Sequence, residues 1–353
     1  MSSRPIGAFV TQSTDALFQF HFNKCNVNVQ VYNDLDSFTA SQHDYKIACL
    51  QFPYPIDPNF SSVITDLLSR CDRVLVLASE LHDRTVDVFR AVDHPRVSYF
   101  ICGELNHPLV HSPVHKLYDW FTTSAHFYKH VRPETLNVLR PYDPKPYYFD
   151  ALLGRKKLHR DYAFEHISKT KNIVTYINDV TCDFTDPAKW LWETEGLVQL
   201  QDIAWTVDHA MYYGHRMCVS QIVPLNIYNQ TAYSLVAETN YSNHYNFYTE
   251  KTVKPILGKR LFVMLSGQHQ LRNLRQMGFQ TFDGIIDETY DTVENTYDRF
   301  DLVMQQVKYL ETQPQQEILN KIKPICEHNF KIMTQIDWYG MFFRTAFVGY
   351  FNQ

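Results

Sequence analysis

Along the first part of the chain, short apolar runs alternate with segments whose apolar residues recur at helical spacing. The runs at 46–52, 73–79 and 97–102 are nearly continuous and end in polar turns, which is typical of buried strands. The intervening segments 61–70 and 83–91 have apolar residues at three- and four-residue steps. Because strands and helices alternate, we expect a parallel sheet covered by helices.

A proline-rich segment, 131–148, interrupts this alternation. Prolines lack a backbone donor and favour extended chain, so the segment is predicted to be an interdomain linker. Strands are predicted beyond it at 149–154, 172–178, 233–239, 260–265 and 284–288. The pattern therefore predicts two α/β domains, an N-terminal one of residues 1–145 and a C-terminal one of residues 146–353.

The last third of the chain has a clear helical repeat. Apolar residues at three- and four-residue steps between Val293 and Leu310 predict an amphipathic helix. The final segment, 338–351, is rich in aromatic residues and is expected to return to the surface of the first domain. Residues 183–224 have strand, helix and loop signals in no clear order.

Composition narrows the function classes. The 353 residues are enough for two domains. A net charge of −5 without a long run of one sign gives no indication of a broad basic face, so contact with nucleic acid would have to come from a local patch. Seven scattered cysteines include no C-x-x-C pair, which favours a reducing compartment. The N-terminus leads into no apolar signal region, and no apolar run is long enough to span a membrane. We therefore expect a cytoplasmic protein, in the host cytoplasm if it is viral.

The densest basic cluster is the run Gly154–Arg160, GRKKLHR, between a predicted strand and a helix expected to begin near Asp161. A glycine turn that opens a helix exposes backbone N–H groups at the positive helix end. Arg155, Lys156 and Arg160 would add charge suited to a diphosphate. A solvated turn is the ordinary alternative, but ligands of open α/β domains bind at such strand-to-helix turns.

A second polar constellation follows the predicted strand at 233–239. Thr249 is expected to cap a helix, with Glu250 in its first turn and Lys251 reaching back over the loop. Carboxylate oxygens accept hydrogen bonds from ribose hydroxyls, and a lysine neutralises phosphate. Together with the basic turn these residues predict a nucleotide site, which we expect to contain Glu238, Thr239, Asn240, Tyr248, Thr249, Glu250 and Lys251.

Four sequence segments resemble the donor-binding half of fucosyltransferase-related GT-B glycosyltransferases, namely YSLVAETNY, FYTEKTVKPIL, LFVMLSGQHQLRNLRQMGFQTF and IIDETYD. The T-E-K and G-F-x-T-F words, with the upstream LLGRKKLHR, are also similar to phage-type glycosyltransferase-like proteins. The resemblance covers about residues 150–310. It implies two Rossmann-like domains facing across a cleft, and donor binding by the residues named above, with Arg155 and Lys156 against the diphosphate.

Lys254-Pro255-Ile256 departs from the fucosyltransferase pattern, so the resemblance does not carry over GDP-fucose, and a UDP-sugar is favoured. For the catalytic base, which such enzymes place on the N-terminal domain, the strand ends offer Glu80 and Glu104, with His82 and His107 nearby. Asp34-Leu35-Asp36 is attributed to local backbone hydrogen bonding. No metal site is predicted, although Mg²⁺ could assist through the nucleotide phosphates.

Three functions remain open. The first is glycosylation of a 5-hydroxymethylpyrimidine in phage DNA, supported by the phage-type resemblance and by basic and aromatic residues at 116–132 suited to a phosphate backbone and an extruded base. The second is glycosyl transfer to a surface polysaccharide or lipid-linked glycan. The third is a non-catalytic binding module that has kept the fold.

Overall fold

The computed structural model describes residues 5–52, 57–79, 81–131, 133–167, 170, 172–178, 211–212, 215–216 and 223–352. The chain divides into two compact units. Unit 1 comprises residues 1–119, 211–215 and 337–353, and unit 2 comprises residues 120–210 and 216–336. The chain first passes from unit 1 to unit 2 after Asp119, whereas the sequence-based division lies at residue 145. The aromatic C-terminal segment belongs to unit 1.

Unit 1 contains a parallel six-stranded sheet, and the strands predicted at 46–52, 73–79 and 97–102 are confirmed. The sheet order is β2-β1-β3-β4-β5-β7. Its strands are β1 (Ile6–Val10), β2 (Val29–Tyr32), β3 (Lys46–Gln51), β4 (Arg73–Ala78), β5 (Val97–Ile101) and β7 (Val114–Lys116). The helices between them are α1 (Asp15–Cys25), α2 (Leu35–Ala40), α3 (Phe60–Leu68) and α4 (Asp83–Ala91), and the short strand β6 (Glu104–Leu105) lies between β5 and β7 along the chain. This is the order of a doubly wound α/β domain.

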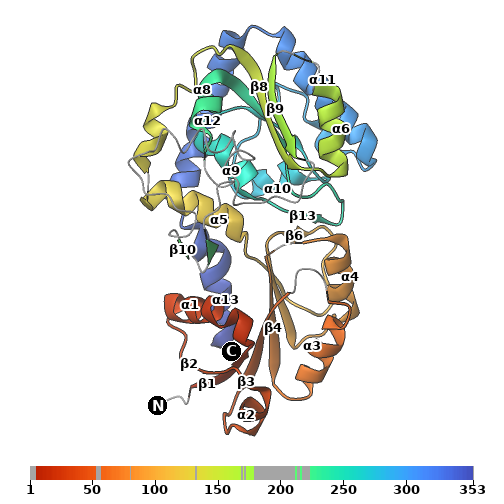
Figure 1. Cartoon of the computed structure of the whole chain (residues 1–353), viewed down its shortest axis with the longest axis vertical. Coiled ribbons are helices and arrows are strands. Elements are labelled where there is room, and N and C mark those ends of the chain that lie inside the picture. Colours follow the sequence, from red (N-terminus) through yellow and green to blue (C-terminus); the bar gives the residue numbers. More distant parts are fainter. Residues whose placement is uncertain are drawn as a thin grey trace. The chain divides into compact units, whose positions relative to one another are not determined.

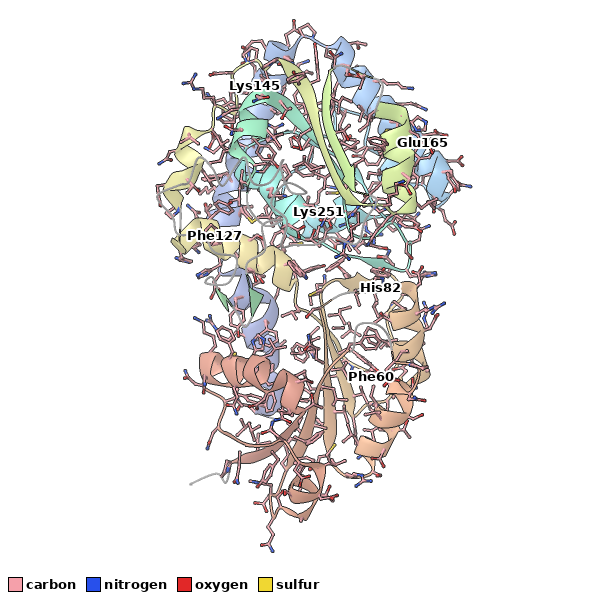
Figure 2. All side chains as sticks on the ribbon, in the orientation of Figure 1. Phe60, His82, Phe127, Lys145, Glu165 and Lys251 are labelled. Atoms are coloured by element: carbon pink, nitrogen blue, oxygen red, sulfur yellow. The ribbon has the colours of Figure 1, made fainter. Side chains whose placement is uncertain are left out.

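Helices cover both faces of this sheet (Figure 1). On one face, Phe60 of α3, labelled in Figure 2, packs against Phe52, which follows β3, with ring centroids 4.8 Å apart. On the other face, the C-terminal segment forms a π-helical turn (Gly340–Arg344) and α13 (Thr345–Phe351). Its Phe343 and Phe347 contact Phe100 of β5. The aromatic residues of the C-terminus therefore complete the core of unit 1.

Unit 2 is built on a parallel four-stranded sheet in the order β14-β12-β8-β9. Its strands are β8 (Tyr147–Arg155), β9 (Ile173–Asn178), β12 (Thr231–Ala237) and β14 (Phe262–Leu265), which confirm four of the predicted strands. The chain runs from β8 to β9 on one side and continues with β12 on the other side of β8. Of the strands described, β8 and β12 therefore flank the point where the order reverses, which is where open α/β sheets bind ligands.

The helices of unit 2 lie on the two sides of its sheet (Figure 1). One side has α6 (Leu158–Ile167) and α11 (Thr296–Thr312), and the other has α8 (Leu225–Gln230), α9 (Glu250–Leu257) and α12 (Gln315–Gln335). Other short elements include α5 (Asp119–His126), α10 (Gln270–Gln276) and the two-residue strands β10 (Met211–Tyr212), β11 (His215–Arg216) and β13 (Tyr245–Asn246), of which β10 belongs to unit 1. The predicted amphipathic helix is α11, whose Phe300, Val303, Val307 and Leu310 are buried.

A buried ion pair ties the amino ends of the strands together. Arg260, just before β14, is 2% exposed and lies 2.9 Å from the carboxylate of Asp150 in β8. Its guanidinium also donates to Ser234 Oγ and to the backbone oxygens of Tyr228, Thr231 and Tyr233. Buried charges are tolerated when they are paired and hydrogen-bonded in this way. The pair fixes the sheet at the edge opposite to the strand ends that carry the candidate site.

Two predictions were wrong. Residues 284–288 form no strand but a turn, because Gly284 has φ +82 and the N–H groups of Ile285 and Ile286 both bond to the oxygen of Phe282. The segment 131–148 is not extended throughout: a 3₁₀ helix spans Pro133–Val138, since proline fits the first turn of a helix, where no donor is needed.

Among the described residues, no helix is both long and apolar enough to cross a membrane.

Candidate functional site

The carboxyl end of β8 turns sharply into α6. The β8–β9 register shifts between Leu152 and Gly154, and Gly154 has φ +63, a left-handed conformation that favours glycine. Arg155 and Lys156 follow and are exposed, whereas Arg160 is 4% exposed and His159 is fully buried. The basic run predicted from the sequence is therefore divided into an exposed pair and a buried set.

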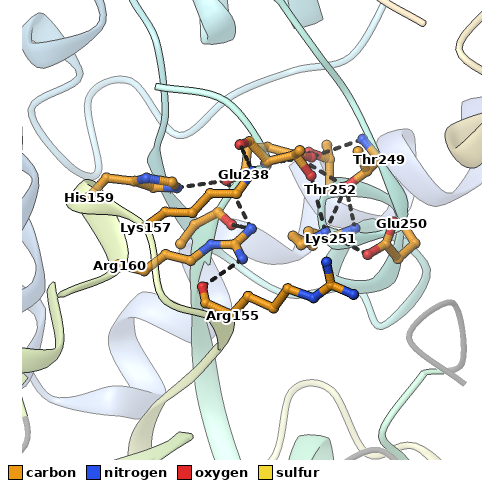
Figure 3. A network of polar contacts seen from close by, with 11 residues as sticks. Arg155, Lys157, His159, Arg160, Glu238, Thr249, Glu250, Lys251 and Thr252 are labelled. Atoms are coloured by element: carbon orange, nitrogen blue, oxygen red, sulfur yellow. Dashed lines mark hydrogen bonds and ion pairs between the residues drawn. The ribbon is translucent and has the colours of Figure 1, made fainter. Parts of the chain in front are cut away.

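The half-buried Lys157 and the buried His159 and Arg160 are bonded to the end of β12 (Figure 3). Lys157 Nζ donates to the oxygen of Thr239 at 2.8 Å, and His159 Nε2 lies 2.7 Å from the oxygen of Glu238. The guanidinium of Arg160 donates to the same Glu238 oxygen at 3.2 Å. Burial, followed by the charge of Arg160, holds the pKa of His159 well below its ordinary value, so the ring is neutral and its Nε2–H donates. These three side chains tie α6 to β12 across the reversal point.

Glu238 follows β12 directly and is fully buried. One carboxylate oxygen accepts from the N–H of Thr249 at 2.9 Å and from the hydroxyl of Thr252 at 2.6 Å. The other accepts from the N–H of Thr239 at 2.9 Å and from the hydroxyl of Thr249 at 2.8 Å. The side chain thus joins the end of β12 to the first turn of α9.

The start of α9 follows the sequence prediction. Thr249 is the N-cap, Glu250 is in the first turn, and Lys251 reaches back to the hydroxyls of Thr239 and Thr249, each at 3.4 Å. Lys251 Nζ lies 2.6 Å from the carboxylate of Glu250 (Figure 3). Burial would raise the pKa of Glu250, but Lys251 and Lys254 outweigh it and lower the pKa below its ordinary value. Glu250 is therefore ionised beside the ammonium group.

Asn240 and Tyr248 shape the loop between β12 and α9. The Asn240 amide donates to the backbone oxygens of Ser242 and Tyr245, at 3.1 and 2.6 Å, and the Tyr248 hydroxyl donates to the oxygen of Gln270. Gly267, after β14, approaches this loop so closely that a Cβ there would lie 2.2 Å from the oxygen of Ser242. Both predicted residues are buried, and their bonds hold the loop in place.

The structure thus gathers the predicted residues of unit 2 at the carboxyl ends of β8 and β12. Arg155, Lys156 and Lys251 supply positive charge, and Figure 3 shows the Arg155 side chain extending in the direction of Lys251 and Glu250. Arg160, Glu238 and Asn240 make the internal bonds described above. Contact of any of these residues with a donor stays a prediction.

The catalytic candidates belong to unit 1. Glu80 lies outside the described residues. Glu104, in β6, forms an ion pair with Lys116 of β7 at 2.6 Å, and its side chain is 27% exposed. The role of Glu104 as a base stays a prediction.

Two sequence hypotheses can be compared with the side chains. The aromatic residues at 116–132, expected to stack on an extruded base, are largely core residues: Phe121 packs on Tyr248 and Phe279, and the Tyr128 hydroxyl accepts from the N–H of Val223. Asp34 caps α2 by accepting from the N–H of Ser37 at 2.7 Å, as the local hydrogen-bonding explanation predicted. Within the described ranges, no group of three or more His, Cys, Asp or Glu residues is placed to hold a metal ion.

Sequence reasoning missed four residues of the site. Lys157, His159, Thr252 and Gly267 were not proposed as members. Thr252 could have been predicted from the sequence, because it lies three residues after the cap Thr249, where a side chain faces the helix start. Lys157 and His159 were not, since their acceptors are backbone oxygens about 80 positions away along the chain.

Comparison with known proteins gives little further guidance. No protein-family model matches the chain, and no curated protein does. A search of solved structures finds the crystal structure of an α1,3-fucosyltransferase, with a TM-score of 0.36 and 10% sequence identity over 100% of this chain and 90% of that one. A likeness of this degree supplies no argument about function, which is inferred below from the side chains.

Proposed function

We propose that the chain is a glycosyltransferase whose unit 2 binds a nucleoside diphosphate sugar at the carboxyl ends of β8 and β12. The observation that carries the proposal is that Arg155 and Lys156 follow β8 directly and Lys251 lies at the start of α9 after β12, so that both flank the point where the strand order reverses, with Arg155 extending toward Lys251 (Figure 3). Ligands of open α/β sheets bind at such points. The two sources of positive charge lie on different elements, which suits a ligand with two phosphates.

The ammonium of Lys251 is held in a defined position. Glu250, beside it, is 4% exposed and ionised, and the hydroxyls of Thr239 and Thr249 lie 3.4 Å from Nζ. A fixed lysine at a helix start adds to the positive end of the helix dipole, and both favour phosphate oxygens. Holding the cation before the ligand arrives lowers the cost of ordering it during binding.

In the proposed reaction, the acceptor hydroxyl oxygen forms a bond to the anomeric carbon while the bond from that carbon to the phosphate oxygen breaks. The nucleoside diphosphate leaves with the bonding electrons, and Arg155, Lys156 and Lys251 stabilise the charge that develops on it. A carboxylate takes the hydroxyl proton: Glu104 is the candidate among the described residues, and Glu80, which lies outside them, is the second candidate.

For the substrates, we propose a UDP-sugar as donor and a 5-hydroxymethylpyrimidine in DNA as acceptor. The support is the phage-type resemblance of residues 150–310; the buried rings of Phe121 and Tyr128 give the DNA acceptor no support. A glycan acceptor and a binding module without catalysis are the competing outcomes of the test.

The test is incubation with UDP- and GDP-sugars and three acceptors: DNA containing 5-hydroxymethylcytosine, oligosaccharides and a lipid-linked sugar. Products are identified by mass spectrometry, and an increase of one sugar residue identifies donor and acceptor together. Lys251→Met should abolish transfer, whereas Lys308→Met, on the exposed side of α11, should retain it. Transfer that survives Lys251→Met would contradict the assigned donor site, and nucleotide binding without transfer would favour the binding module.

A further inference from the structure

We propose that Glu238 is a positioning residue that acts on the donor phosphates through Lys251, and that it does not contact the donor. This inference rests on the proposed function, because it assigns a role within the same donor site. It differs from the sequence-based prediction, in which the Glu238 carboxylate grips the donor directly.

The first argument is the capacity of the carboxylate. An ionised carboxylate offers about four acceptor positions. Glu238 uses them on four donors, namely the N–H groups of Thr239 and Thr249 and the hydroxyls of Thr249 and Thr252, at distances of 2.6 to 2.9 Å. The side chain is fully buried. A ribose hydroxyl would have to displace one of these donors and leave it buried without a partner, which is costly.

The second argument is that the backbone of Glu238 is held from the opposite direction. Its carbonyl oxygen receives His159 Nε2 at 2.7 Å and Arg160 at 3.2 Å, both from α6. Lys157 secures the next residue by donating to the oxygen of Thr239. Glu238 is therefore fixed to α6 through its backbone and to α9 through its side chain, so it joins the two helices that flank the reversal point.

The third argument is the short path from Glu238 to the cation. The Thr249 hydroxyl donates a hydrogen bond to Glu238, so the lone pairs of the hydroxyl oxygen face Lys251. The backbone nitrogen and Nζ of Lys251 lie 3.3 and 3.4 Å from this oxygen. Lys251 Nζ also reaches the hydroxyl of Thr239, whose N–H is bonded to Glu238. Loss of the Glu238 carboxylate would free both threonines and, with them, the ammonium of Lys251 (Figure 3).

A double-mutant cycle distinguishes positioning from direct contact. Calorimetry would measure the binding of UDP, GDP and their 2′-deoxy forms to the wild type, Glu238→Gln, Lys251→Met and the double variant. If Glu238 acts through Lys251, Glu238→Gln weakens binding of the diphosphate by about tenfold. The double variant is then no weaker than Lys251→Met alone, because the two losses are not additive. The preference for ribose over deoxyribose stays at its wild-type value in Glu238→Gln.

Two controls separate this effect from general destabilisation. Glu288→Gln changes another buried carboxylate of unit 2 that accepts from a backbone N–H and a threonine hydroxyl, those of Phe282 and Thr281, and it should leave binding unchanged. Thr252→Val removes one of the four donors to Glu238 and should weaken binding, while Thr252→Ser should restore it. This pair tests the inference even if Glu238→Gln does not fold.

The outcomes are distinct. Additive losses in the cycle, or loss of the ribose preference in Glu238→Gln, would overturn the positioning role in favour of direct contact. Wild-type binding by both Glu238→Gln and Thr252→Val would overturn it as well, while leaving the proposed function in place. If the wild type binds no nucleoside diphosphate, the proposed function fails and the inference fails with it.

Discussion

Gly267 offers a sharp test of how closely the loops after β12 and β14 approach each other. A Cβ at position 267 would lie 2.2 Å from the oxygen of Ser242, far inside contact distance, and 3.4 Å from the amide nitrogen of Asn240. Because the closest atom belongs to the backbone, rotation of a side chain cannot relieve the overlap. Overpacking of this kind costs about 1–3 kcal/mol. Gly267→Ala should therefore destabilise unit 2 and displace the loop that carries Asn240.

The assay is thermal unfolding of Gly267→Ala beside Gly349→Ala, with calorimetric titration of a nucleoside diphosphate. For a domain of this size each kcal/mol lowers Tm by about 2–4 °C, so Gly267→Ala should unfold several degrees earlier and bind the nucleotide more weakly. Gly349 lies in α13, and a Cβ there meets nothing within 4 Å. Alanine at that helical position should raise stability by about 0.5–1 kcal/mol. An unchanged Tm for Gly267→Ala would refute the close approach of the two loops.

Two further predictions concern buried charges. Asp150→Ala leaves the Arg260 guanidinium, which is 2% exposed, without its carboxylate and should lower the free energy of unfolding by about 3–5 kcal/mol in urea titrations; a loss below 1 kcal/mol would contradict the burial of the pair. Because Lys251 and Lys254 hold the pKa of Glu250 below its ordinary value, its ionised form stabilises the fold at pH values above that ordinary value, and this contribution is lost as the pH falls through the lowered pKa. Glu250→Gln should therefore flatten the acid side of a stability profile, and an unchanged profile would argue against the pairing with Lys251.

The fold could largely be predicted, because buried parallel strands are apolar almost throughout. The segments 73–79 and 97–102 became β4 and β5, and the helix predicted at 83–91 has those bounds in the structure. The turn at 284–288 was mistaken for a strand, because its two isoleucines are apolar but follow a glycine with positive φ. Local pattern does not reveal such a backbone conformation.

The site could be predicted in its location but not in the use of each side chain. The basic run Gly154–Arg160 and the helix start at Thr249 do lie at the same edge of one sheet. Arg160 donates to backbone oxygens at the end of β12, a use that the sequence did not indicate, while its predicted contact with phosphate stays a prediction. That use depends on β8 and β12 being neighbours, and strand order is a long-range property that spacing along the chain does not encode.

The central claim is that unit 2 binds a nucleoside diphosphate through Arg155, Lys156 and Lys251. Its most direct test is calorimetric titration of UDP and GDP into the wild type, Arg155→Gln with Lys156→Gln, Lys251→Met and the control Lys308→Met. The account predicts saturable binding of at least one nucleotide to the wild type and to Lys308→Met, and strongly weakened binding in the other two variants. Lys308→Met and Arg155→Gln with Lys156→Gln should unfold at the wild-type temperature, whereas Lys251→Met, which leaves the buried Glu250 without its partner, should unfold earlier and is titrated below its own transition. Equal affinity in all four proteins, or no binding of either nucleotide to the wild type, would contradict the account.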